Sequence, residues 1–256
     1  MEIIIQDKLK AELFINIFQN IKLFSDIFTI DINEETFYIQ GMDASHVSIF
    51  EINLTREWFD TYNVSSSTSL GINSSIFPKI LNTWTCDHNI KLNITKEDYL
   101  DIAFEKISGN TEYNKYFEIP LVDVDTEKLN ITDQEYTTDL EFDSKKLKKL
   151  IDELSIIGEH VNIKCTESEV NATSKSLEGS MTINIPFNDI EAYSIEEGKH
   201  VDATFALKYV KNMCLFNKVS PNVLLHLTEG LPMQLKYEMT ENSYVRFYLA
   251  PNIDDM

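Results

Sequence analysis

The order of amphipathic segments repeats along the chain. Four segments carry apolar side chains at three- and four-residue steps, as helices packed through one face do. They are residues 7–24, 73–81, 144–154 and 204–216. Runs rich in Ile, Val, Phe, Tyr and Thr, which are typical of strands, lie between them. Each half reads as helix, strands, helix, strands, and this order indicates an internal duplication.

The strand-like runs outnumber the helices in both halves. Examples are residues 27–32, 36–40, 46–54, 90–94, 100–107, 161–164, 181–186, 223–227, 233–239 and 244–249. We therefore predict an α+β fold in which two similar domains each combine antiparallel sheets with two helices. The predicted domains are residues 1–120 and 137–256, joined by an acidic connecting loop at residues 121–136.

The net charge restricts the partners that the chain can bind. Lys and Arg number 22 against 42 Asp and Glu, so the formal net charge of the 256 residues is −20. A chain this acidic repels phosphate, and contact with a nucleic acid or an anionic membrane requires local segregation of its lysines. No apolar run approaches the roughly 20 residues that span a bilayer. We expect no association with a membrane.

Motifs of catalysis and metal binding are missing from the sequence. It has no glycine-rich phosphate loop, no His-Glu-x-x-His and no Gly-x-Ser-x-Gly. Cys86, Cys165 and Cys214 form no Cys-x-x-Cys pair, and the five His are scattered. We expect no enzyme, no cofactor and no metal, and an enzyme assembled from distant residues is a lesser alternative. The first residues lack the features of a signal peptide, and a reducing compartment is expected.

Positive charge is concentrated on the predicted helices. Helical geometry places Lys145 and Lys149 opposite the apolar stripe of the third helix, and Lys208 and Lys211 away from the stripe of the fourth. One interpretation is that these are ordinary solvated helix faces. The alternative is that several helices face one polyanion while the acidic strands face elsewhere.

Several segments resemble one family, in that family's order. The longest is IQGMDASHVSIFEINLTREWFDTY at residues 39–62. Others are LGIN at 70–73, DQEY at 133–136, SIIG at 155–158, TFALKY at 204–209 and YLAP at 248–251. Together they closely resemble proliferating cell nuclear antigen, the eukaryotic and archaeal sliding DNA clamp, and the resemblance spans essentially the whole chain.

This resemblance implies a homotrimeric ring that is a processivity factor without catalysis of its own. Helices line the hole of such rings, sheets form the outside, and duplex DNA is contacted through phosphates without sequence preference. The positions that match the family's DNA-facing residues are Lys22, Lys79, Lys149 and Lys208. Helical geometry adds Lys145 and Lys211. Ile15 and Asn16 stand where the family carries basic residues, so we expect a less positive first helix.

The resemblance also implies a groove beneath the connecting loop that binds short apolar and aromatic peptides of partner proteins. The matching positions are Met42, His46, Val47, Ile49, Leu129, Ile131, Tyr136, Pro232, Tyr248, Leu249, Ala250 and Pro251. The partners implied are DNA polymerase, the clamp loader, flap endonuclease and ligase.

Neighbouring subunits of this family pair edge strands, here near residues 113–120 and 176–185. The expected contact residues are Phe117, Leu177, Met181 and Ile183.

Two alternatives stay open on the sequence. The chain could be one subunit of a heterotrimeric clamp, or an acidic adaptor that keeps the groove but has lost ring function. The family implies the nucleus, or a viral replication compartment if the source is a large DNA virus.

Overall fold

The computed structural model describes residues 1–96, 98–107, 109, 112–123, 129–131 and 134–252. The chain divides into two compact units. The first contains Met1–Ala44, Glu51–Leu129 and Met239–Val245, and the second contains Ser45–Phe50, Asn130–Glu238 and Arg246–Met256. Antiparallel strands dominate both, and the α+β class predicted from the sequence is confirmed.

Two sheets build the first unit. One has the order β5 (Thr61–Asn63), β1 (Glu2–Ile5), β7 (His88–Lys96), β8 (Tyr99–Lys106) and β9 (Lys115–Pro120). The other runs through β4 (Ser48–Thr55), β3 (Thr36–Met42), β2 (Ile27–Ile32) and β6 (Thr68–Asn73). A 3-10 turn, η2 (Arg56–Trp58), follows β4.

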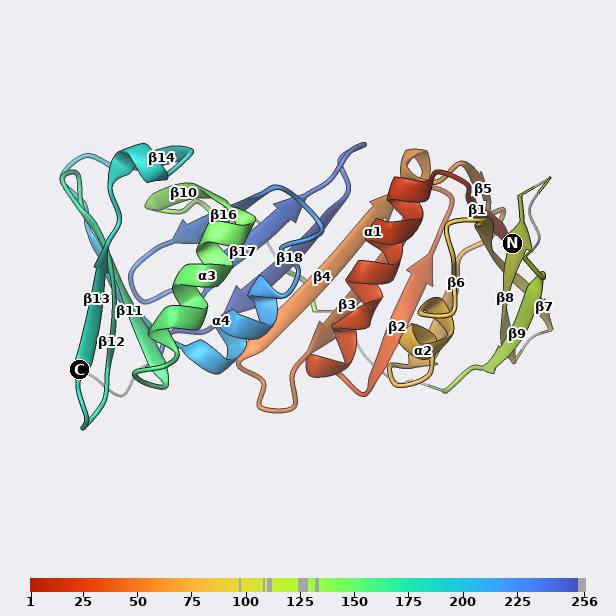
Figure 1. Cartoon of the computed structure of the whole chain (residues 1–256), viewed down its shortest axis with the longest axis horizontal. Helices are drawn as coiled ribbons and strands as arrows, with labels where there is room; N and C mark the ends of the chain where they lie inside the picture. The colour runs from red at the N-terminus through yellow and green to blue at the C-terminus, as the bar shows by residue number, and fades with distance from the viewer. Residues whose placement is uncertain (97, 108, 110–111, 124–128, 132–133, 253–256) are drawn as a thin grey trace. The chain divides into compact units, whose positions relative to one another are not determined.

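Helices α1 (Lys8–Gln19) and α2 (Phe77–Leu81) lie over β2, β3 and β6 in Figure 1, and η1 (Ile21–Leu23) follows α1. Aromatic rings fill the space beneath them. The ring of Phe18 lies 4.7 Å from those of Phe14 and Phe77 and 5.7 Å from that of Phe28. Asp7 caps α1 by accepting the amide of Lys10, as its position before the helix predicts.

The second unit repeats the plan. One sheet has the order β14 (Ala192–Ile195), β10 (Thr138–Asp143), β16 (Asn222–Leu227), β17 (Met233–Glu238) and β18 (Tyr244–Leu249). The other has β13 (Ser180–Asn184), β12 (Val170–Lys175), β11 (His160–Cys165) and β15 (Val201–Ala206). Helices α3 (Ser144–Leu154) and α4 (Leu207–Cys214) lie over the first of these sheets, and η3 (Phe187–Asp189) precedes β14.

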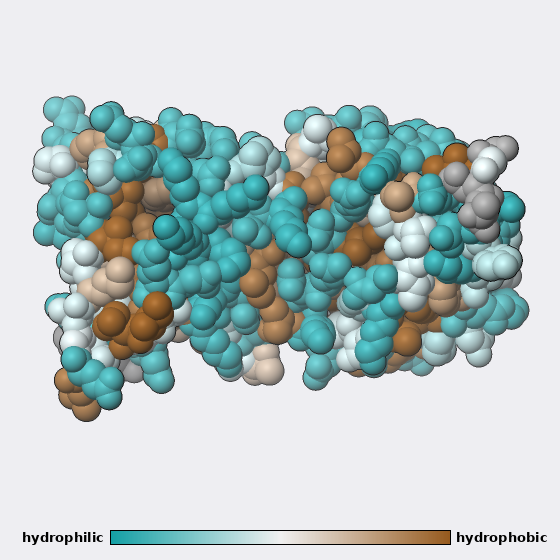
Figure 2. All heavy atoms as spheres, viewed as in Figure 1, coloured by the Kyte–Doolittle hydropathy of each residue, from teal (hydrophilic) through white to brown (hydrophobic). Residues whose placement is uncertain are grey.

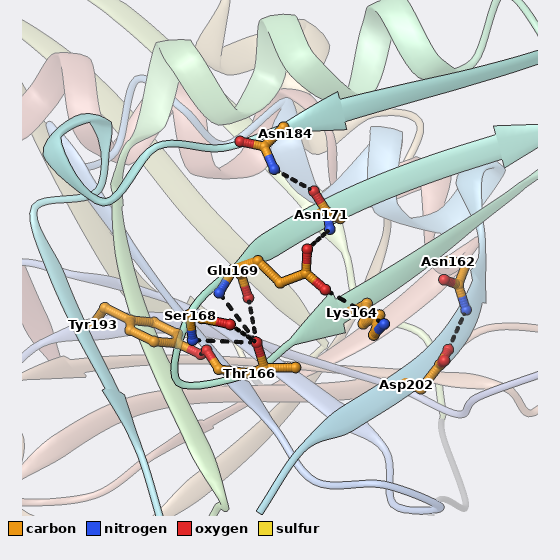
Figure 3. A network of polar contacts seen from close by, with 9 residues as sticks. All are labelled: Asn162, Lys164, Thr166, Ser168, Glu169, Asn171, Asn184, Tyr193 and Asp202. Carbon is orange, nitrogen blue, oxygen red and sulfur yellow. Dashed lines mark hydrogen bonds and ion pairs between the residues drawn. The ribbon is translucent and has the colours of Figure 1, made fainter.

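Polar side chains cross-link the four-stranded sheet of the second unit (Figure 3). Asn184 on β13 donates to Asn171 on β12 at 2.8 Å, and Asn171 donates to Glu169 at 3.0 Å. The ammonium of Lys164 on β11 lies 3.4 Å from the Glu169 carboxylate. Side chains of the alternate residues on β11 and β12 are buried, so one face of this sheet is polar and the other belongs to the core.

Two predicted helices begin later than the sequence pattern indicates. The fourth begins at Leu207, because residues 204–206 continue β15, in which Thr204 pairs with Asn162 of β11. The helix expected over residues 73–81 begins at Phe77, since Asn73 ends β6 and its side chain accepts the amide of Ser75 in a turn.

The first helix, predicted at residues 7–24, ends earlier than expected. Helix α1 ends at Gln19, and after Asn20 the chain forms the short 3-10 helix η1. The third is confirmed at residues 144–154, with Asp143 as its cap. Strands β1, β5, β6, β9, β10, β12, β14 and β15 are not among the strand-like runs given as examples from the sequence, and only β9 matches a strand that the family resemblance implies, near residues 113–120. Much of the connecting loop predicted at residues 121–136 lies outside the described residues.

The strand expected over residues 176–185 is shorter than predicted. It covers only Ser180–Asn184, because the amide of Ser176 bonds the carbonyl of Gly179 and closes a turn. Leu177 lies in this turn and is fully exposed. It therefore belongs to the hairpin tip rather than to the edge strand.

The three cysteines differ in accessibility, and this predicts their reactivity. Cys165 and Cys214 are buried, and burial raises the pKa of each thiol to about 12, so both stay neutral at pH 7. Cys86 is exposed. We expect Ellman's reagent to modify one thiol in the native protein and all three in guanidinium chloride, with Cys86→Ser abolishing the native reaction. Rapid native modification of a second thiol would show that a unit opens readily.

Candidate nucleic-acid and peptide interfaces

Helix α3 presents a basic face because its apolar stripe is buried. Leu147, Ile151 and Leu154 pack inward, whereas Lys145 and Lys149 are exposed. The side chain of Asp143 accepts the amides of Lys145 and Lys146 at 3.0 and 2.8 Å and so fixes the start of the helix. In Figure 2 hydrophilic surface covers most of α3.

Two ion pairs lie on this basic face. The ammonium of Lys148 is paired with the carboxylate of Asp152, and that of Lys149 lies 3.7 Å from Glu153. The Lys149 side chain is 79% exposed. Solvated pairs of this kind contribute about 0.3–0.5 kcal/mol. Lys149 can therefore exchange its carboxylate partner for a phosphate at little cost.

Helix α4 adds two lysines beside α3. Val210 and Met213 are buried, and Lys208 and Lys211 are exposed. The ammonium of Lys211 donates to Ser155 Oγ at 3.1 Å, and this hydroxyl donates to the carbonyl of Asp152. Ser155 thus orients Lys211, a role that no pattern in the sequence indicates. The ammonium of Lys208 lies 5.5 Å from the centre of the Tyr209 ring.

In the first unit the two lysines that match DNA-facing positions lie outside α1. Lys79 lies in the last turn of α2, and Lys22 lies in η1. On α1 itself, the ammonium of Lys8 is 4.0 Å from Glu12, and that of Lys10 lies 5.8 Å from the Trp58 ring. The structure therefore places two of the six predicted lysines in the first unit and four in the second.

The positions that match the peptide groove lie mostly in the second unit. The amide of Ala250 donates to the carbonyl of Val47 at 3.0 Å, so the C-terminal segment runs beside the loop before β4. Val47 is 36% exposed, and Tyr248 and Leu249 are buried. His46 is exposed with a φ of 59°, which is uncommon for a residue with a side chain and fixes a tight turn.

A buried amide connects two aromatic members of this set. Gln234 on β17 donates to the hydroxyls of Tyr136 and Tyr248 at 3.3 and 3.4 Å. The Tyr136 ring lies 5.3 Å from that of His226. The remaining members in this unit, Ile49, Ile131, Pro232 and Pro251, are half-buried. Partly exposed apolar side chains of this kind suit an apolar ligand.

Two members of the predicted groove belong to the first unit. Met42 ends β3 and is half-buried, and Leu129 is 38% exposed. The side-chain amide of Gln40 bonds the backbone of Leu129. No pattern in the sequence singles out Gln40.

Three of the four expected subunit contacts lie on strands that end their sheets, and the fourth, Leu177, lies in the turn before β13. Strand β9 ends the five-stranded sheet, and β13 ends the four-stranded sheet. Phe117 on β9 is half-buried, as are Met181 and Ile183 on β13. The Phe117 ring lies 5.5 Å from that of buried Phe104, which anchors it to the sheet.

Metal-binding clusters and membrane-spanning helices do not accompany these surfaces within the described residues. There, no group of three or more His, Cys, Asp or Glu could hold a metal ion. In the same part of the chain, no helix is long and apolar enough to cross a membrane.

Both halves of the chain match models of known domains. Residues 5–128 match the proliferating cell nuclear antigen N-terminal domain, and residues 130–252 match the C-terminal domain. The proliferating cell nuclear antigen of Dictyostelium discoideum is 30% identical over 252 residues, which cover 96% of this chain and 98% of that protein.

Solved structures with the same architecture cover 98% of the chain. The PCNA2–PCNA3 complex from Sulfolobus tokodaii matches with a TM-score of 0.87 and 22% identity over 98% of this chain and 99% of that chain. Proliferating cellular nuclear antigen from Entamoeba histolytica matches with a TM-score of 0.87 and 25% identity over 98% of both chains.

Proposed function

The chain belongs to the proliferating cell nuclear antigen family of DNA sliding clamps, and from this premise we propose that three copies close into a ring around duplex DNA. The family is a scaffold without catalysis of its own. A closed ring slides along the duplex but does not readily leave it, so the protein tethers replication and repair proteins to their template.

One observation supports the proposed DNA contact. In a chain with a net charge of −20, exposed lysines gather on the helix faces opposite the core: Lys145 and Lys149 on α3, Lys208 and Lys211 on α4. Lys22 and Lys79 complete the set in the first unit. Flexible ammonium groups of this kind bind phosphates in any sequence, so the contact is weak and sensitive to salt.

The second unit carries most of this contact. On α1, Lys8 and Lys10 are engaged with Glu12 and Trp58, and Ile15 is buried. This weak basic character of α1 favours the alternative of an acidic adaptor without ring function.

Partner proteins dock through short apolar and aromatic peptides in the proposed groove around Tyr248 and Ile131. We assign to it the peptide motifs of DNA polymerase, the clamp loader, flap endonuclease and ligase, and we place the protein in the nucleus or in a viral replication compartment. Edge strands β9 and β13 join neighbouring copies, through Phe117 on one and Met181 and Ile183 on the other. The same edges could accept a different chain, as in a heterotrimer.

Light scattering after gel filtration tests the ring. We expect a mass near three times the chain mass of 29.6 kDa at low and near-physiological salt. A monomer at every protein concentration would contradict the homotrimer and favour the heterotrimer or the adaptor.

Charge reversal tests the DNA contact. We expect the double variant Lys149→Glu, Lys208→Glu to keep the trimer mass but to be retained poorly on duplex DNA whose ends are blocked after loading. The slope of log Kobs against log salt concentration should become shallower by about one for each phosphate that the variant no longer binds. The matched control is Lys175→Glu, Lys199→Glu, which makes the same charge change at exposed positions outside the helices. Equal retention of both variants would reject the assignment.

Truncation of apolar side chains tests the groove. We expect Ile131→Ala and Tyr248→Ala each to weaken binding of a synthetic peptide with one aliphatic and two adjacent aromatic residues about tenfold, because contacts of this kind contribute at least about 1 kcal/mol. Calorimetry gives the Kd. Ile156→Ala, the same truncation at a side chain that is 80% exposed, should have no effect. Unchanged affinity in both groove variants would count against this site.

A further inference from the structure

A side chain of β3 holds the connecting loop by two hydrogen bonds. Gln40 Nε2 donates to the carbonyl oxygen of Leu129 at 3.0 Å, and the amide of Leu129 donates to Gln40 Oε1 at 2.8 Å. The two residues are 89 positions apart in the sequence and belong to the same unit. The side-chain amide thus replaces the peptide group of a neighbouring strand, since it offers one donor and one acceptor side by side.

The position of Gln40 on β3 explains why its side chain can reach the loop. Phe37 and Ile39 are fully buried, and Tyr38 and Gln40 alternate with them, so the latter two occupy the other face of the sheet. Both are half-buried. A side chain held in a strand has few rotamers left to lose when it binds, which favours its use as an anchor.

A buried carboxylate fixes the orientation of the Gln40 amide. Glu51 on β4 is only 4% exposed, and it accepts the hydroxyl proton of Tyr38 at 2.5 Å. The Tyr38 oxygen in turn accepts from Gln40 Nε2 at 3.1 Å. Both hydrogens of the amide nitrogen are therefore used, one on Tyr38 and one on Leu129. The amide oxygen must then face the Leu129 amide, which is the orientation that the loop requires.

We propose that Gln40 is a positioning residue for partner binding: it holds residues 129–131 of the connecting loop on β3 through Leu129, so that these residues are already in place when a partner peptide arrives. This inference rests on the proposed peptide groove, in which Leu129 and Ile131 are members. A loop that is ordered beforehand spares the peptide the entropy of ordering it, and affinity rises by the fraction of molecules in the competent state.

We call the two hydrogen bonds between Gln40 and Leu129 the latch. Limited proteolysis tests the latch in the absence of any partner. Lys128 precedes Leu129, so trypsin can cut next to the latched residue. A protease binds the residues on both sides of the bond that it cuts, so cleavage requires Leu129 to release its two hydrogen bonds to Gln40. The variant Gln40→Leu nearly keeps the side-chain volume and removes both hydrogen bonds to Leu129 together with the one to Tyr38. We expect it to raise the initial rate of cleavage at Lys128–Leu129 about tenfold, with the thermal midpoint and trimer mass unchanged.

The peptide-binding assay measures whether loss of the latch weakens partner binding. We expect the same variant to bind the synthetic aromatic peptide about tenfold more weakly. Gln19→Leu is the matched control, because it also breaks a side-chain amide bond, to Asn82 at 2.9 Å, in the same unit. It should change neither readout.

The outcomes separate the latch from the groove. Unchanged tryptic cleavage in Gln40→Leu would overturn the latch, and faster cleavage with unchanged peptide affinity would overturn its positioning role. If the wild type binds no peptide while Gln40→Leu still accelerates cleavage, the proposed groove fails and the latch stands as a loop anchor only. Accelerated cleavage with weakened binding, and no change in Gln19→Leu, supports the inference.

Discussion

Burial of one apolar stripe per helix against a sheet is the constraint on which the rest of this structure depends. On α3, Leu147, Ile151 and Leu154 must leave water, and the rotation of the helix about its axis is fixed by that requirement. The lysines that alternate with these residues in the sequence therefore lie on the solvent-facing side of the helix. In the first unit the cluster around Phe18 does the same for α1. The surface chemistry of each helix is therefore a consequence of its core.

This coupling explains how a strongly acidic protein can contact DNA. The charge of −20 is distributed over the whole chain, but at a distance beyond about 8–10 Å exposed charges are largely screened at physiological ionic strength. In the proposed contact, a phosphate meets the local set of lysines on α3 and α4. Their carboxylate partners, such as Glu153 for Lys149, lie on the solvated helix face and hold them weakly. The contact can therefore form and break quickly, as sliding requires.

The proposed peptide site follows a different principle, because it depends on polar groups that order an apolar surface. Gln234 ties two tyrosine hydroxyls together, and Gln40 ties the connecting loop to β3. Buried or half-buried amides are specific anchors, since a donor and an acceptor must both be satisfied. Apolar contact supplies affinity at such a site, whereas these amides decide its shape.

The sequence by itself determined the α+β class, the third helix, and the separation of lysines from the apolar stripe, because these follow from local periodicity. It misplaced the start of α4, since residues 204–206 pair with β11, and it placed Leu177 on a strand rather than in a turn. Only the tertiary structure decided these points, together with the link from Gln40 to Leu129 and the orientation of Lys211 by Ser155. Each depends on a partner far away in the chain, and hydrogen bonds between distant residues leave no periodic pattern in a sequence.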